Sequence, residues 1–169
     1  MTDMGVESYF VTLYLEETDA NRNLAVDKLS ALLEAHSHTV KELHKKITAD
    51  GYDKIVIDDI VELWLESDES GKNICLIGCF SCYLESRSLI CRTAALIEST
   101  YPVKSIKVYG AEISPDDDIS EAILEKYRVK YEDFVGRFSN KQYRTYPDNF
   151  YNVYCSFGLL NGLKRLFSR

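Results

Sequence analysis

The feature that most constrains the fold is the alternation of two kinds of apolar pattern along the chain. In one kind, β-branched and aromatic residues crowd a short run, which is typical of strands. In the other kind, apolar residues recur every three or four positions, as on one face of a helix. The strand-like segments are residues 8–17, 54–67, 73–80 and 103–113. The helix-like segments are residues 24–35, 36–48, 83–100, the stretch that begins at 114, and the tail from about 148.

The order of these segments predicts an α+β domain. It resembles the ferredoxin-like βαββαβ arrangement, in which helices cover one face of a four-stranded antiparallel sheet. We therefore expect a single domain over 1–169, with 1–113 as the βαββαβ core and 114–169 as a C-terminal helical extension. A chain of 169 residues is long enough to bury about 70% of its unfolded surface.

Local signals predict where several elements begin or break. Thr39 and Glu42 have the T-x-x-E spacing of a capping box, which favours a helix within 36–48. The Asp58–Asp59 pair interrupts the 54–67 strand and indicates a turn or a bulge. Ser114 and Pro115 are followed by three acids, a typical helix start, because negative charge is stabilised at a helix N-terminus.

Charge divides the chain into an acidic body and a basic tail. The net charge is −7, from 27 acidic and 20 basic side chains. Residues 136–169 hold six basic side chains and one acidic one, so the acidic excess lies within 1–135. Because an acidic body repels phosphate backbones, nucleic acid is not expected as a partner and a basic protein is favoured.

The sequence also predicts a compartment. It contains no run of about 18 apolar residues, so no membrane-spanning helix and no membrane contact are expected. Its first ten residues, MTDMGVESYF, lack the basic and apolar regions of a signal peptide. Five cysteines, an odd number, fit a reducing environment in which thiols stay unpaired. We therefore expect a cytoplasmic protein.

Four of the five cysteines lie in NICLIGCFSCYLESRSLIC, residues 73–91. The C-x3-C-x2-C spacing of Cys75, Cys79 and Cys82 resembles the cluster-binding signature of radical-SAM enzymes. A strand over 73–80, however, would place Cys75 and Cys79 about 13 Å apart, too far to share one iron–sulfur cluster. The CFSC part resembles a thioredoxin-type pair at a strand-to-helix junction, a position that favours a reactive thiolate. Cys79 and Cys82 thus support an alternative function, a thiol redox enzyme or sensor.

No metal, cofactor or catalytic residue is predicted. His36, His38 and His44 form a loose cluster with no evident further fixed ligand. The Asp116–Asp118 run lacks the spacing of a calcium-binding loop and is explained by helix N-terminal electrostatics. The chain contains no phosphate-binding glycine loop, nucleophile elbow or H-E-x-x-H motif.

In size, acidity and lack of catalytic motifs, the chain is similar to the acidic immunity proteins of bacterial toxin–immunity pairs. This resemblance implies a non-catalytic inhibitor that neutralises a basic toxin or nuclease-like protein partner. The acids expected to contact that partner are Glu62, Glu66, Asp68 and Glu69 around the 54–80 hairpin, and Asp116, Asp117 and Asp118 before the next helix. Tyr143 and Tyr146 add aromatic side chains of the kind that dominates binding hot spots.

Overall fold

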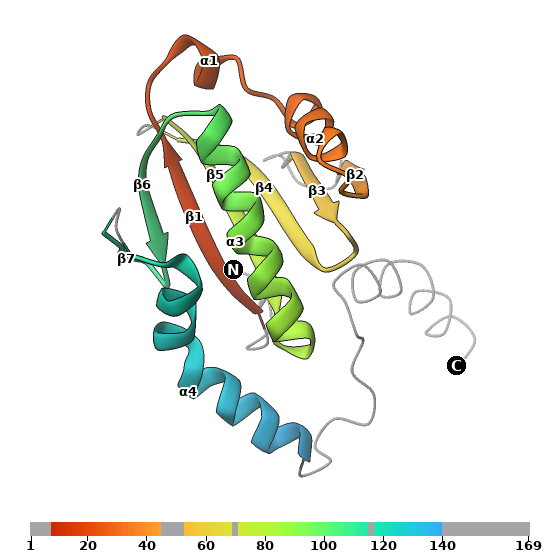
Figure 1. Cartoon of the computed structure of the whole chain (residues 1–169), viewed down its shortest axis with the longest axis vertical. Helices are drawn as coiled ribbons and strands as arrows, with labels where there is room; N and C mark the ends of the chain where they lie inside the picture. The colour runs from red at the N-terminus through yellow and green to blue at the C-terminus, as the bar shows by residue number, and fades with distance from the viewer. Residues whose placement is uncertain (1–7, 45–52, 69–70, 115–116, 140–169) are drawn as a thin grey trace, which may run out of the picture.

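The computed structural model describes residues 8–44, 53–68, 71–114 and 117–139. Within these ranges, seven strands form one antiparallel sheet in the order β2-β3-β4-β5-β1-β6-β7 (Figure 1). The strands are β1 (Ser8–Leu15), β2 (Val40–His44), β3 (Asp53–Ile57), β4 (Val61–Asp68), β5 (Gly71–Cys79), β6 (Val103–Val108) and β7 (Ala111–Glu112). The helices are α1 (Asp19–Arg22), α2 (Val26–Ala35), α3 (Tyr83–Thr100) and α4 (Ile119–Ser139), and a 3-10 turn, Phe80–Cys82, leads into α3.

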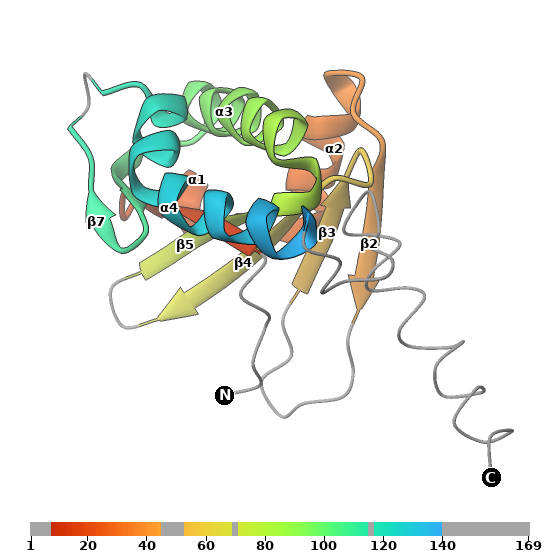
Figure 2. The ribbon, with the colours of Figure 1, turned by 90° about the horizontal axis from the view of Figure 1, so that it is seen from below.

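Helices α2, α3 and α4 lie on one side of the sheet, so the described part of the molecule has two layers (Figure 2). This arrangement confirms the predicted α+β class. The sheet is larger than the four strands expected, because β2, β3 and β7 extend it at its two edges. Within the ranges described, no helix combines the length and the apolar content needed to cross a bilayer.

The predicted helix over 36–48 is wrong where the structure describes it. After α2 ends, Ser37 adopts a left-handed backbone with φ 67° and turns the chain. Val40–His44 then form β2, an edge strand that pairs along its length with β3. Asp58 fixes the start of this strand, since its Oδ1 accepts a hydrogen bond from Thr39 N at 2.7 Å and its own N donates to Thr39 O at 2.9 Å. Pairing with β3 thus outweighs the tendency to form a helix that the capping-box spacing indicates.

Asp58 and Asp59 form the tight turn between β3 and β4. Both have left-handed backbones, with φ 51° and 58°, as the two central residues of a type I′ turn require. Ile60 closes this turn with a hydrogen bond to Ile57 O at 3.0 Å and completes the three-residue connection to β4. The predicted strand over 54–67 is therefore two antiparallel strands. β4 also pairs with β5, which confirms the hairpin expected between 54–67 and 73–80.

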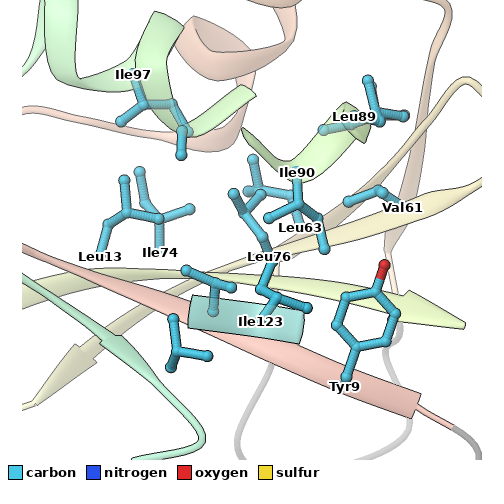
Figure 3. Packing of buried hydrophobic residues seen from close by; sticks show 14 of the residues in the cluster. Tyr9, Leu13, Val61, Leu63, Ile74, Leu76, Leu89, Ile90, Ile97 and Ile123 are labelled. Atoms are coloured by element: carbon cyan, nitrogen blue, oxygen red, sulfur yellow. The ribbon is translucent and has the colours of Figure 1, made fainter. Parts of the chain in front are cut away.

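The core lies between the sheet and its three helices (Figure 3). It is built from alternate strand positions and from the inner faces of the helices. Fully buried members include Leu13 of β1, Leu63 of β4, Leu76 of β5, Ile90 and Ile97 of α3, and Ile123 of α4. Because burying one such side chain contributes roughly 1.5–3 kcal/mol, this layer is the main source of stability. α4 shares this core with the sheet.

One contact in this core requires a glycine. Tyr9 on β1 lies opposite Gly78 on β5, and a Cβ atom at Gly78 would lie 2.4 Å from Tyr9 Cζ. The Tyr9 hydroxyl lies 2.5 Å from Ser86 Oγ on α3. Burial raises the pKa of Tyr9, so this hydroxyl stays protonated. Because Gly78 has no side chain, the Tyr9 ring fits beside it, and the Tyr9 hydroxyl connects β1 to the start of α3.

The other side of the sheet carries a mixture of apolar and charged side chains. We define the second face as Lys54, Val56, Glu62, Trp64, Cys75 and Ile77, which point away from the helices on β3, β4 and β5. Strand register makes them neighbours, because Val56, Glu62 and Ile77 form one cross-strand row and Lys54, Trp64 and Cys75 form the next.

Candidate partner-binding groove

Glu62 lies at the centre of the second face and is fully buried. Its carboxylate forms an ion pair with Lys54 Nζ, and the Lys54 side chain is only 6% exposed. The same ammonium group lies 5.3 Å from the centroid of the Trp64 ring. The expectation that Glu62 is exposed to a partner is therefore wrong. β4 is an interior strand, and the charge of Glu62 is matched by its neighbour across the strands.

The other acids predicted around the hairpin are placed differently. Glu66 points to the same side of β4 as Glu62 and is half-buried. Asp68 is the last residue of β4 and pairs through its backbone with Gly71. The remaining predicted contacts outside the described residues are Glu69, Asp116, Tyr143 and Tyr146.

Asp117 and Asp118 are exposed immediately before α4. Asp117 Oδ2 accepts a hydrogen bond from Ser114 N at 2.8 Å, and Asp118 Oδ1 accepts one from Ser120 N at 2.7 Å. The Asp118 carboxylate is thereby held at the N-terminus of α4, where negative charge is stabilised, whereas Asp117 closes a turn with Ser114. The two bonds fix the position of the acids and leave their charge at the surface.

A groove of about 160 Å³ lies beside Asp117, between β6, β7, the end of α3 and the start of α4. Its apolar lining consists of four half-buried β-branched residues: Val103, Ile106, Ile113 and Ile119. Three exposed acids line it as well: Glu98 of α3, Glu112 of β7, and Asp117. We call these seven residues the acidic groove. Its acids come from α3, from β7 and from the segment before α4, and they meet only in the folded chain.

Negative charge dominates the acidic groove. Lys104 is the one basic residue among the groove's described lining residues. None of the ion pairs formed among the described residues involves Glu98, Glu112 or Asp117. Lys107 lies opposite Glu112 in the strand register, but its ammonium group lies over the Tyr14 ring, 4.5 Å from the centroid. No ion pair among the described residues therefore offsets the negative charge of these three acids.

The groove also borders an open part of a sheet edge. β7 pairs with only Lys107 and Val108 of β6, and Ile113 N adds one hydrogen bond to Ile106 O. On that side, residues 103–105 of β6 have no neighbouring strand in the part of the chain that the structure describes. An extended segment of a partner protein can add to such an edge through main-chain hydrogen bonds.

This combination suits one kind of side chain. A lysine or arginine carries a long aliphatic stem that packs on apolar surface and a cationic head that stays close to water and to anions. The β-branched lining offers a surface for the stem, and the three carboxylates offer acceptors for the head. The acidic groove therefore fits a basic side chain presented by an extended segment.

Two groove acids, Glu98 and Glu112, are not among the contacts predicted from the sequence. Glu98 carries a usable signal, because it lies in the last turn of α3, where the helix dipole disfavours negative charge and where no basic residue compensates. Glu112 carries no comparable signal. Its place beside the groove depends on the tight turn at Tyr109 and Gly110, whose φ angles are 54° and 76°.

The cysteines of the 73–91 segment are thiols that are not joined by disulfides. Cys79 and Cys82 are 3% and 8% exposed, and the Cys82 thiol lies 3.7 Å from the Cys79 carbonyl oxygen. A thiol that exchanges with a substrate disulfide needs access to it. Burial also raises the pKa of Cys75 to about 12, so this thiol is protonated at neutral pH. The geometry gives the redox alternative little support.

The described histidines have separate roles. His36 Nδ1 lies 2.9 Å from Leu32 O at the end of α2, and His38 Nδ1 lies 2.7 Å from Asp58 Oδ2. Across the described ranges, no group of three or more His, Cys, Asp and Glu side chains is arranged to hold a metal ion.

Comparison of the chain with protein-family models and with curated proteins finds no match.

Proposed function

We propose that the protein is a non-catalytic binding protein that recognises a basic protein partner at the acidic groove. One observation carries the proposal: three exposed acids surround an apolar lining and form no ion pair with any described residue. Solubility requires only that acids lie on the surface, and does not require three of them to surround β-branched side chains. Binding of a lysine or arginine requires both features at one place.

The energetics favour several modest contacts over one strong one. An exposed ion pair contributes only about 0.2–1 kcal/mol, so charge alone gives weak affinity. Packing of the basic stem on Val103 and Ile106, together with strand addition at residues 103–105, supplies the rest. The carboxylates then act mainly on the rate of encounter and on the choice of partner, which makes binding sensitive to salt.

An inhibitor of the immunity type is the function that best unites these features. Such a protein acts in the cytoplasm without catalysis and neutralises a basic toxin or nuclease-like partner. The excess of 27 acidic over 20 basic side chains supports this class, because it attracts a basic protein and repels nucleic acid.

At the level of topology, we propose that β4, β5, β1 and β6 form a ferredoxin-like core that has been elaborated at both edges. Their adjacent, antiparallel order in the sheet supports this proposal, as do the helical segments after β1 and after β5. β2 and β3 would then be an insertion that lengthens the sheet on the β4 side.

Charge reversal tests the binding proposal. Wild-type protein, the double variant Glu112→Lys/Asp117→Lys and the double variant Asp27→Lys/Glu34→Lys would each be immobilised and exposed to native lysate at low and high salt. The second variant makes the same change in charge on α2, away from the groove. We expect a basic protein to bind the wild type and the α2 variant at low salt, and to be lost from the groove variant and at high salt.

Titration calorimetry with the purified partner then separates the outcomes. Loss of affinity in the groove variant alone supports the proposal. If no protein binds the wild type at either salt concentration, or if both double variants lose the partner equally, the groove is not the recognition site.

A further inference from the structure

We propose that the chain binds a small zwitterion of the α-amino acid class in a cavity beside α1, at the end of the sheet where β1 stops and β6 starts. This site is separate from the acidic groove, and the inference does not depend on the proposed function. It rests on a buried asparagine whose amide oxygen lacks a hydrogen-bond donor, and on opposite charges that line the same cavity without pairing.

The cavity has a volume of about 240 Å³. Its polar lining comes from the segment between β1 and α2 and from the hairpin of β4 and β5: Glu16, Glu17, Asn21, Arg22, Ser67 and Lys72. We call this site the α1 cavity, because α1 lies beside the end of β1 and the start of β6 (Figure 1). Pockets for drug-sized ligands have about 300–1,000 Å³, so the α1 cavity fits a smaller molecule.

Asn21 has its side-chain amide fixed in one orientation. The residue is 2% exposed, and its Nδ2 donates to Glu16 O at 2.9 Å and to Pro102 O at 2.8 Å. The amide oxygen could not take the place of Nδ2, because carbonyl oxygens only accept hydrogen bonds. Oδ1 is buried as well, and it accepts no hydrogen bond from the residues that the structure describes. Since a buried acceptor without a donor is unfavourable, this atom suits an N–H group of a bound molecule.

The charged side chains of the α1 cavity pair incompletely. Arg22 lies 3.9 Å from Glu17 in an exposed ion pair. Glu16 and Lys72 line the same cavity, but neither takes part in any ion pair among the described residues. The Lys72 ammonium group is held in place, because it donates a hydrogen bond to Leu24 O. The cavity therefore offers one carboxylate and one ammonium group that have no counter-ion within the described part of the chain.

A zwitterion complements these groups. Its ammonium group can donate to Asn21 Oδ1 and to the Glu16 carboxylate, while its carboxylate accepts from the Lys72 ammonium group. A simple cation would leave Lys72 without a counter-ion, and a simple anion would leave the buried amide oxygen without a donor.

The balance of charge points to the same class of ligand. Two acidic and two basic side chains line the α1 cavity, so a ligand without net charge matches it. An α-amino acid carries an ammonium group and a carboxylate on a small frame and meets both requirements. The acidic groove differs, because its acids outnumber its single lysine.

The test uses each proteinogenic L-amino acid as a probe on the full-length protein. We expect at least one of them to raise the midpoint of thermal unfolding and to shift the NMR signal of the Asn21 side-chain amide. Two matched probes for that amino acid are the amine that lacks its carboxylate and the carboxylic acid that lacks its amino group. Each should bind about tenfold more weakly, because each loses a charge-assisted contact.

Two variants locate the site by the probe that they affect. Glu16→Gln should weaken binding of the amino acid and of the matched amine about tenfold, but not that of the matched carboxylic acid. Lys72→Met should weaken binding of the amino acid until it equals that of the matched amine. Asp27→Asn, which removes an exposed acid from α2, should match the wild type with all three probes.

Two results would overturn the inference. In one, no amino acid shifts the Asn21 signal, which would leave Oδ1 to an ordinary water molecule. In the other, an amino acid binds the wild type, Glu16→Gln and Lys72→Met equally tightly, which would place its site elsewhere. If Lys72→Met lowers the unfolding midpoint without a probe, Lys72→Gln, which keeps a donor for Leu24 O, decides by the same criteria.

Discussion

Two groups of acids in this protein experience opposite environments. Glu62 is fully buried in an interior strand and is matched by Lys54. Glu98, Glu112 and Asp117 are exposed around a groove and take part in none of the ion pairs among the described residues. The same residue type therefore stabilises the fold in one place and is exposed to a partner in another. Removal of the first acid should therefore affect stability, and removal of the others should affect binding.

The largest effect is expected for Glu62→Ala. This change leaves the Lys54 ammonium group buried without its carboxylate, which costs about 3–5 kcal/mol of unfolding free energy. Urea denaturation followed by Trp64 fluorescence measures the loss. If the loss is below about 1 kcal/mol, Glu62 is as dispensable as a surface acid and the comparison fails.

The matched control removes both charges at once. In the double variant Lys54→Met/Glu62→Leu, no charge is left buried, so stability should return to that of the wild type or exceed it by about 1–4 kcal/mol. If the double variant is as unstable as Glu62→Ala, lost packing at this position is the cause, and desolvated charge is not.

A smaller effect is expected at alkaline pH from Cys75, next to the buried pair. Burial, with added repulsion from Glu66 and Glu62, raises the pKa of this thiol from 9.0 to about 12 in the folded state. Between these values the unfolded thiol ionises while the folded one does not, so stability is complete below pH 9 and declines as pH rises. At pH 10 the decline amounts to about 1.4 kcal/mol. Unfolding of wild type and Cys75→Ala, compared from pH 8 to 10, should show the steeper decline in the wild type; parallel curves would contradict this assignment.

Next to the groove, Asp118→Ala should cost about 1 kcal/mol. The variant loses the hydrogen bond that Ser120 N donates to Asp118 Oδ1 at the start of α4. Thermal unfolding measures this loss, with Asp118→Asn as the control that keeps an acceptor. Equal losses in both variants would show that the charge near the helix dipole matters more than the hydrogen bond.

The smallest effect, and one of opposite sign, is expected for Glu98→Gln. The change removes a negative charge from the last turn of α3, which should raise stability by about 0.3–1 kcal/mol at low salt. In the same variant, affinity for the basic partner should fall. A variant that is less stable than the wild type would assign Glu98 a structural role and remove it from the groove.

Much of the fold is predictable because its signals are local. The β-rich runs at 8–17 and 73–80 and the helix over 83–100 appear within a few residues of their predicted bounds. The break at Asp58–Asp59 marks a turn, since two adjacent acids tolerate the left-handed backbone that a tight hairpin needs. The segment around Val40 is different, because its capping-box spacing favours a helix while its edge position against β3 makes it a strand.

The candidate site is less predictable, because it depends on contacts between separate segments of the chain and not on local signals. Of the predicted contacts, Asp117 lies in the groove, but the helix that follows it begins at Ile119 with Asp118 at its N-terminus, and not at Ser114 and Pro115 as the local signals predict. The prediction that Glu62 contacts a partner is wrong, because strand alternation gives the side of the sheet to which its side chain points but not whether the side chain is buried there. Glu98 and Glu112 are 14 residues apart in the chain, and no local pattern brings them together.

The acidic balance, the α+β class and the positions of most helices and strands follow from the amino-acid sequence, because they depend on composition and on periodicities of two and 3.6 residues. Which acids are buried and which meet at the groove depends instead on how the segments pack together. Burial and proximity arise from strand order and from the placement of α3 and α4 against β6. These are long-range contacts that no single segment encodes.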